Sequence, residues 1–432
     1  MPGSQMPIQR LFAKKSRLKF LAGVLSAIAV VIVSYLFFTH QAITMHSASS
    51  PKQLESSLAN TADKTCPVTR DQYFQPFHPE SIWNRPIGSH AQYVDAGLKR
   101  GRAVTGITLD EDMIILAPNA PKKRLTTTGW SGDKRCNTDG EDLYSGLQVP
   151  IPDNYETTFH GTTPNMSGAI LLEDGEQILQ TQPLHVCRAG GPAGSGFQYP
   201  TVTFDAKAES KWGAHGGSSL SSIGGTLRCG EMTRENPHIH HALKINVFAK
   251  KYLLKCALGK PYEDSLIYRA DAYACSNEAI AYGGSNPAVR MGSLLALKPD
   301  FDLSLLKTEP GRLLAQAFIE YGAYIVDDTA RNVYAIPTAH EVVEQSDGSF
   351  RVCNFAEQFK AEWGFKFNQR NGRFANDFHT MVENLYAVAN NIKNPDSVYG
   401  EPDPQPDNPK DWEISKTAGG GSAIGCFASP LE

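Results

Sequence analysis

The hydrophobic pattern divides the chain into one long apolar run near its start and many short runs after residue 66. The long run, Phe20–Phe38, contains 19 residues without a charge. A helix with a rise of about 1.5 Å per residue would make it roughly 28 Å long, close to the thickness of a bilayer's hydrocarbon core. Five cations precede the run, and the first acid after it is Glu55. This asymmetry predicts a transmembrane signal-anchor over residues 20–38, with residues 1–19 in the cytoplasm.

The rest of the chain is then exported. Residues 39–65 are small, polar and without period, which predicts a linker, and residues 66–432 form the exported domain. Cleavage near Ala48 is the alternative, although a cleaved signal usually has a shorter apolar core of about 7–15 residues. We expect an inner-membrane anchored protein whose domain faces the periplasm or exterior, or a secreted protein if the anchor is cut.

After residue 66 the apolar runs are short, rich in Val, Ile, Leu, Thr and Tyr, and separated by Gly, Pro, Asn and Asp. This pattern predicts β-strands. The clearest runs are residues 106–109, 113–117, 169–172, 177–180, 201–204, 225–228, 242–248, 291–297, 323–326 and 333–336. Because few helices are available as crossovers, we expect a mainly β domain, a jelly-roll-like β-sandwich with a few peripheral helices.

Three segments predict those helices. The first is Pro310–Tyr321, with Thr308 as its N-cap and Gly322 where a terminating glycine is expected. The second covers about Asn354–Trp363 and the third about Ala375–Asn391.

Charge and cysteine usage exclude several functions. The chain of 432 residues has a net charge of −4, and without the five leading cations 36 basic and 45 acidic residues remain, about −9. Such a surface does not attract nucleic acid, and it argues against a polyanionic substrate unless the cleft is locally basic. The eight cysteines include no CxxC pair, so export predicts up to four disulfides rather than a zinc ribbon. Cys256 and Cys275 could close one loop, but the spacing does not fix the pairing.

The segment from Trp212 to Leu243 combines two glycine pairs with four histidines, Arg228 and Glu231. Glycine pairs allow a backbone to approach a ligand closely. In a polysaccharide lyase, Arg228 would neutralise a uronate while a histidine or tyrosine moves the proton. In a hydrolase, two carboxylates would act instead, drawn from Glu231, Asp271, Asp327 and Asp328.

A metal site is a third, minority interpretation of the same segment, with ligands from His215, Glu231, His238 and His240. A cupin-type site would place a glutamate soon after the HxH pair, and here Ala242-Leu243-Lys244 follow. The GAHGGS piece is similar to an esterase oxyanion loop, but the chain has no GxSxG nucleophile elbow. We therefore expect no bound cofactor or metal.

A second candidate segment is the apolar run that ends in Asp327-Asp328. Neighbouring side chains on a strand face opposite sides, so one acid can point into a cleft. We expect the opposing wall of the cleft to carry Tyr324 and Asp327. The facing side is expected to carry the residues His215, Arg228, Glu231 and His240 or His241.

Four blocks of the sequence resemble blocks found in the same order in a group of secreted bacterial proteins with no established activity. They are AHGGSSLSSIGGTLRCGE, HALKINVFAKKYL, YGGSNPAVRMGSLLAL and EPGRLLAQAFIEYGAYIVDDT, and the likeness covers roughly Trp83–Trp363. The resemblance implies an exported bacterial protein and supplies no catalytic residues. More loosely, TLRCGE, PHIHH and NVFAKKY resemble the three cleft strands of jelly-roll alginate lyases. This chain has His238 where that family has the glutamine of its QIH piece, and the spacing differs.

These observations predict an exported carbohydrate-active enzyme that cleaves a polysaccharide, with a lyase favoured over a hydrolase. The alternative is a non-catalytic envelope protein that binds glycan or assembles at the cell surface. A compact site with convergent histidine, arginine and carboxylate groups would favour the enzyme. A flat strip of tryptophans would favour the binder, although core packing is the commoner use of tryptophan.

Overall fold

A computed structural model of the chain describes residues 74–101, 107–129, 135–136, 147–157, 165–255, 282–391 and 398–400. The predicted membrane anchor, the linker, Trp130, Asp271 and the Cys256–Cys275 loop lie outside these residues. Within the described part, none of the helices is both long and apolar enough to cross a membrane.

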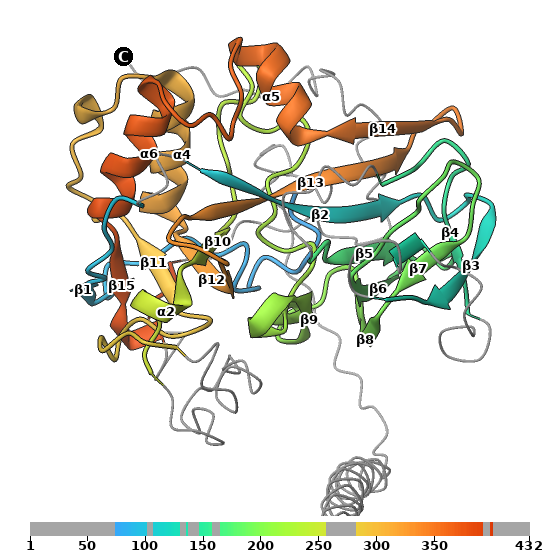
Figure 1. Ribbon diagram of the computed structural model, residues 1–432, viewed down its shortest axis with the longest axis horizontal. Coiled ribbons are helices and arrows are strands. Elements are labelled where there is room, and N and C mark those ends of the chain that lie inside the picture. The colour runs from blue at the N-terminus through green and yellow to red at the C-terminus, as the bar shows by residue number, and fades with distance from the viewer. Residues whose placement is uncertain are drawn as a thin grey trace, which may run out of the picture. The chain divides into compact units, whose positions relative to one another are not determined.

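The centre of the domain is an eleven-stranded sheet (Figure 1). Its strands, in spatial order, are β1 (Tyr93–Asp95), β15 (Tyr386–Val388), β11 (Leu294–Ala296), β12 (Ala323–Asp328), β10 (Leu243–Val247), β13 (Ala335–Glu344), β2 (Thr108–Leu116), β5 (Gly168–Leu171), β6 (Gln177–Gln182) and β8 (Phe197–Thr203), with β14 (Phe350–Asn354) also paired to β13. A second sheet has the order β4 (Gln148–Pro150), β3 (Lys122–Thr127) and β7 (Ala193–Ser195). The short strand β9 (Trp212–His215) bridges to Leu220.

The mainly β expectation is confirmed, and a large sheet with a smaller one is compatible with a β-sandwich. The large sheet is mixed, because β10 pairs in parallel with β12, and β2 pairs in parallel with both β13 and β5. A jelly roll is built from antiparallel strands, so these three pairs depart from that pattern.

The helices are α2 (Ala249–Tyr252), α4 (Glu309–Glu320), α5 (Phe355–Trp363) and α6 (Arg373–Glu383). Two of the three predicted helices, at α4 and α5, are confirmed. The third, expected over about Ala375–Asn391, is wrong at its C-terminal end. It stops at Glu383 because the next residues leave the helix and pair as β15 with β1 and β11. Sheet pairing therefore overrides the helical periodicity there.

Two strand predictions are also corrected. Residues 108–109 of the first predicted run and 113–116 of the second belong to one strand, β2, which continues through the polar Asp110-Glu111-Asp112 between them. The run at 225–228 is no strand. Only Leu227 pairs there, in a single parallel bridge to Thr338 of β13.

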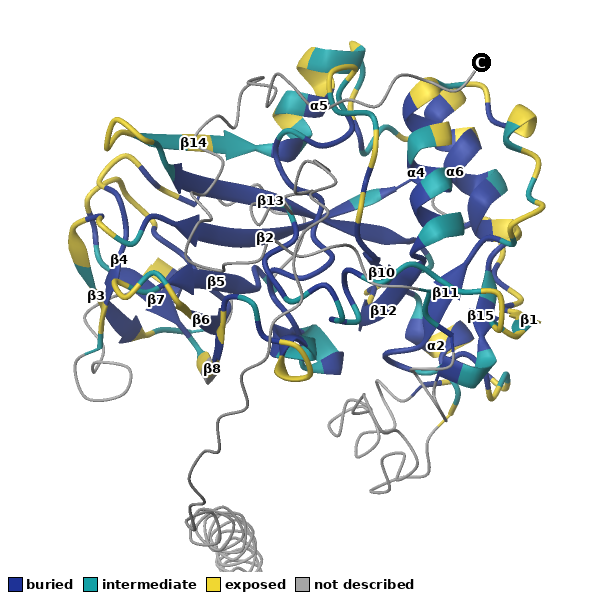
Figure 2. Ribbon diagram, turned by 180° about the vertical axis from the view of Figure 1, so that it is seen from behind, coloured by how far each residue is buried: buried dark blue, intermediate teal, exposed yellow. Residues whose placement is uncertain are grey.

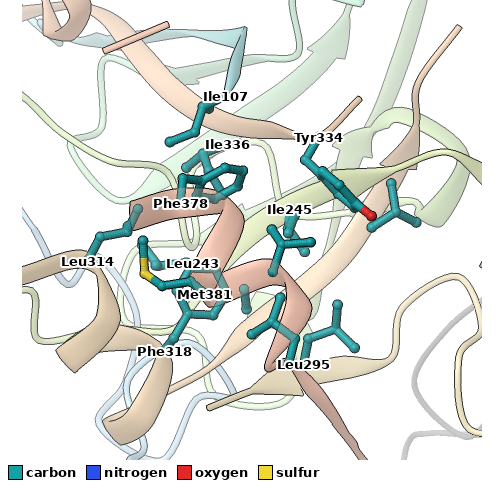
Figure 3. Packing of buried hydrophobic residues seen from close by; sticks show 14 of the residues in the cluster. Ile107, Leu243, Ile245, Leu295, Leu314, Phe318, Tyr334, Ile336, Phe378 and Met381 are labelled. Atoms are coloured by element: carbon teal, nitrogen blue, oxygen red, sulfur yellow. The ribbon is translucent and has the colours of Figure 1, made fainter. Parts of the chain in front are cut away.

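The two faces of the large sheet carry different cores. On β10, Leu243 and Ile245 pack with side chains of α4 and α6 (Figure 3), and Val247 belongs to the same buried cluster. The alternate residues of the same strand point to the opposite face, where the packing includes Trp83 and Tyr324. Figure 2 shows that the central strands β2, β10 and β13 are buried along most of their length.

The start of α4 gives a test of the capping interaction. The Thr308 hydroxyl accepts a hydrogen bond from Gly311 N at 3.1 Å and donates one to Asp377 Oδ2 at 2.6 Å, linking α4 to α6. Thr308→Ala should lower the free energy of unfolding by about 1–2 kcal/mol, because both hydrogen bonds are lost. Urea unfolding measures the change. Thr308→Ser, which keeps the hydroxyl, is the control and should lose much less.

Candidate functional site

Charged side chains lie on the buried inner strands of the large sheet. Asp112 of β2 and Lys244 of β10 are 0–1% exposed, and Lys244 Nζ donates to Asp112 Oδ2 at 2.9 Å. Asp110 lies two residues before Asp112 and therefore on the same face. Its Oδ2 accepts from Asn246 Nδ2 at 2.5 Å. The centre of this face is thus polar, although apolar residues surround it.

A β-bulge adds a further carboxylate to this face. The register between β10 and β12 shifts after Ile245, so that Lys244 lies opposite Tyr324 while Asn246 lies opposite Asp327. Without the extra residue, Tyr324 and Asp327 would point to opposite sides of the sheet. The bulge therefore turns Asp327 toward Asp110.

The glycine-rich segment from His215 to His241 covers the polar face. His215 ends β9 and is fully buried, with Nε2 3.3 Å from Asp112 Oδ1 and 3.7 Å from Asp110 Oδ2. Thr226 Oγ1 donates to Asp112 Oδ2 at 2.7 Å. Asp110, Asp112, His215, Lys244 and Asp327 are called the polar cluster below.

Three members of the polar cluster meet most closely. Asp110, His215 and Asp327 each place one ligand-type atom within 4.8 Å of the others. Neither ring nitrogen of His215 makes a hydrogen bond to any part of the chain that the structure describes. Asp327 Oδ1 accepts from Asp328 N at 2.8 Å, and its Oδ2 accepts from Asn165 Nδ2.

A second buried network lies beside the polar cluster. Arg228 Nε donates to Glu341 Oε2 of β13 at 2.5 Å, and Arg228 N donates to Glu231 Oε2 at 2.7 Å. The other oxygen of Glu231 lies 2.9 Å from His241 Nε2. The disulfide between Cys229 and Cys353 attaches this part of the cover to β14, which pairs with β13.

Burial and charge shift several pKa values in opposite directions. Burial raises the pKa of Asp327 well above its usual range, and nearby carboxylates including Asp110 raise it further. Burial also acts to raise the pKa of Asp112, but Lys244 and His215 outweigh it and the net pKa is lowered. The pKa of Lys244 is lowered by burial, which Asp112 offsets in part.

The predicted site residues fall into separate groups. His215 and Asp327 come together, and Arg228, Glu231 and His241 form the second network. Tyr324 points to the same face of the sheet as Asp327 but packs against Trp83, with ring centroids 5.3 Å apart, and is hydrogen-bonded to the Tyr399 hydroxyl.

His240 lies outside both groups because its side chain is exposed. Its ring is 5.7 Å from that of His238, which is also exposed. The minority metal set therefore mixes two buried residues, His215 and Glu231, with two at the surface. In the described ranges, the group with metal-ligand spacing is instead Asp110, His215 and Asp327.

Several residues of the site were missed from the sequence: Asp110, Asp112, Lys244 and Glu341. Each is a charged residue inside an otherwise apolar strand, as in TLDEDMIIL for β2. A charged residue within an apolar strand is a sign of a buried polar group, and buried polar groups are more informative about function than exposed apolar side chains. The sequence does not show whether such a charge faces solvent or a buried partner, so this signal does not identify the site by itself.

The described residues also line an open hollow of about 370 Å³. It includes Glu111 of β2, whose side chain points away from the polar cluster and accepts from Asn354 Nδ2 at 2.8 Å. The hollow and the polar cluster are therefore on different faces of the sheet.

Comparisons with protein-family models, curated proteins and solved structures found no match to this chain. The function is therefore argued from the geometry alone.

The contact between Gly216 and Asp327 can be tested by adding one methyl group. A Cβ on Gly216 would lie 2.0 Å from Asp327 Oδ2, and this glycine also has a φ of +37°. Gly216→Ala should cost several kcal/mol of stability, because a buried carboxylate must move. Gly175→Ala is the matched control, with a φ of +67° and open space at the Cβ position. It should cost only about 1–2 kcal/mol from backbone strain. Equal losses in urea unfolding would refute the close packing at Gly216.

The ion pair between Glu231 and His241 predicts a pH-dependent stability. Burial lowers the pKa of His241, but Glu231 outweighs it and the net pKa is raised above the usual value. The stabilisation is therefore present below the unfolded value near 6.5 and is lost as pH rises through the raised pKa. Glu231→Gln should destabilise by about 3–5 kcal/mol near pH 6 and by less near pH 9.

Urea unfolding at the two pH values measures this difference. Glu362→Gln is the control, because it removes the surface ion pair with Arg234. It should cost at most about 1 kcal/mol at either pH. A loss in Glu231→Gln that does not change with pH would contradict the assignment.

Proposed function

We propose that this chain is an exported carbohydrate-active enzyme that cleaves a polysaccharide, with the polar cluster as its reaction centre. One observation carries the proposal: Asp110, His215 and Asp327 converge from three separate segments to within 4.8 Å. Carboxylates and imidazoles held this closely are the groups that move protons in glycan cleavage. Trp83, by contrast, is buried in the core, which weakens the case for a flat aromatic binding strip.

The geometry favours hydrolysis over the elimination that the sequence favours. A lyase needs a cation that can face the uronate of its substrate, and the cations of the polar cluster and of the second network already face carboxylates. Arg228 is paired with Glu341 and Lys244 with Asp112. The polar cluster contains three carboxylates and one ammonium group, so its field repels a polyanion. A neutral glycan therefore suits the site better than a polyuronate.

Export and the sandwich architecture belong to the same proposal. The disulfides Cys136–Cys187 and Cys229–Cys353 support an oxidising compartment. The anchor at residues 20–38 would hold the domain at the outer face of the inner membrane, or release it if cleaved. The jelly-roll topology stays a prediction. The parallel strand pairs argue against it, because jelly rolls are built from antiparallel strands.

A second candidate is the non-catalytic envelope protein that binds glycan or assembles at the cell surface. One observation favours it. Every side chain of the polar cluster is less than a tenth exposed, while a catalytic group must reach its substrate. In that case the charges would hold the sheet and its cover together.

Cleavage assays on the full-length chain in detergent micelles test the proposal. The chain is incubated with neutral and uronate-containing polysaccharides, and the products are analysed by mass spectrometry. We expect cleavage of a neutral glycan with one water added per cut. Asp327→Asn should reduce the rate at least about 100-fold, because a proton-moving group is lost. Glu111→Gln, on the opposite face of β2, is the control and should keep the wild-type rate.

Two results would overturn the proposal. Unsaturated products from uronate polymers would restore elimination as the reaction. Binding of a glycan without any cleavage, unchanged in Asp327→Asn, would favour the non-catalytic envelope protein.

A further inference from the structure

We propose that Asp110, His215 and Asp327 form a binding site for one divalent transition-metal ion such as Zn²⁺ or Mn²⁺. The three residues come from β2, the end of β9 and β12. Each offers one ligand atom, all three atoms lie within 4.8 Å of one another, and all three side chains are buried. The inference concerns ion binding and stands whether or not the site cleaves glycan.

The first supporting observation is the imidazole of His215. Its side chain is 0% exposed, and in the described part of the chain Nδ1 has no hydrogen-bond partner, while Nε2 lies 3.3 Å from Asp112 Oδ1 without the geometry of a hydrogen bond. A buried polar atom without a partner costs about 1–3 kcal/mol, so nearly all such atoms are satisfied in native proteins. Nε2 lies between Asp110 Oδ2, at 3.7 Å, and Asp112 Oδ1, at 3.3 Å. The ring is thus directed at carboxylates, where an ion could satisfy it.

The second observation is the charge of the polar cluster. Asp110, Asp112 and Asp327 bring three buried carboxylates together, and Lys244 supplies one positive charge. The second network does not change this balance, because each of its cations faces a carboxylate of its own. When the three carboxylates are ionised and His215 is neutral, as metal ligation requires, two negative charges remain, which is the charge that one divalent ion neutralises. Buried charges are otherwise strongly destabilising.

The carboxylates are held in place as metal ligands usually are. Asn246 Nδ2 donates to Asp110 Oδ2 at 2.5 Å, and Asn165 Nδ2 donates to Asp327 Oδ2. Such outer hydrogen bonds orient ligands in metal sites. Lys244 is bonded to Asp112 rather than to either of these carboxylates, so it does not occupy the place of the ion.

The donor set identifies the class of ion. Two carboxylate oxygens with one imidazole nitrogen suit Zn²⁺, Mn²⁺ and related ions, whereas Mg²⁺ and Ca²⁺ prefer oxygen donors alone. Ligands about 2.1 Å from an ion lie at most about 4.2 Å apart, so binding requires the three atoms to close by roughly half an ångström. In the proposed hydrolysis, a bound ion would activate water as a Lewis acid.

Metal binding is measured on the full-length chain in detergent micelles after EDTA treatment and removal of the chelator. Zn²⁺ and Mn²⁺ are titrated separately by isothermal titration calorimetry. The number of metal ions bound per chain is measured by elemental mass spectrometry. We expect one ion per chain, and at least a tenfold loss of affinity in Asp110→Asn and in Asp327→Asn. Glu111→Gln, on the other face of β2, should bind as the wild type does.

Thermal unfolding separates loss of the site from loss of the fold. Asp327→Asn removes one of three neighbouring like charges, so its melting temperature without metal should stay close to the wild-type value. Only the wild type and Glu111→Gln should then gain several degrees with added ion. A double variant, His238→Ala with His240→Ala, should keep the stoichiometric ion, because those rings are at the surface.

Either of two results would overturn the inference. One is that the wild-type chain binds neither Zn²⁺ nor Mn²⁺ at one ion per chain. The other is unchanged binding in Asp110→Asn and Asp327→Asn, or its loss in the His238 and His240 double variant. Glycan cleavage is not among these readouts, so failure of the proposed hydrolysis leaves the binding result intact.

Discussion

The domain depends on compensating charges that are buried in the middle of its main sheet. Removing a carboxylate and an ammonium group from water costs several kcal/mol for each ion, and only close pairing recovers that cost. Asp112 and Lys244 make such a pair across β13, between strands that are distant in the sequence. A sheet built this way cannot leave its polar face open. The glycine-rich segment after His215 is therefore required as a cover.

The composition of the cover follows from how closely it must approach the sheet. Gly216 lies against Asp327, and Gly224 and Gly225 lie against the Trp83 ring, where an added Cβ would come within 2.6 Å of ring atoms. Any larger residue would push the cover outward and let water reach the buried charges. The disulfide from Cys229 to Cys353 fixes the middle of the same segment. The glycines and the disulfide thus both hold the cover close to the sheet.

A tightly covered, acidic cluster has consequences for chemistry. Inside a low-dielectric site, each charge acts more strongly on its neighbours than it would in water. The balance of carboxylates over cations makes the site unsuited to a polyanion and well suited to a positive ion. Hydrolysis of a neutral glycan and binding of a divalent ion both follow from this excess of negative charge. The burial itself is the strongest argument for the non-catalytic alternative.

The local sequence determined those helices and strands that depend on interactions between residues close together in the chain. Thr308 and Gly322 mark the ends of α4, and short apolar runs give most of the strands, because capping and periodicity act between near neighbours. His215 and Asp327 were also predicted as site residues from the sequence. Tertiary structure alone decided that the charges of β2 and β10 are buried together. The sequence pattern of a charged residue in a strand is the same whether its side chain faces water or a buried partner. Tertiary structure also decided that His240 is at the surface while His241 is buried against Glu231, because only the packing of the folded chain distinguishes the two neighbours.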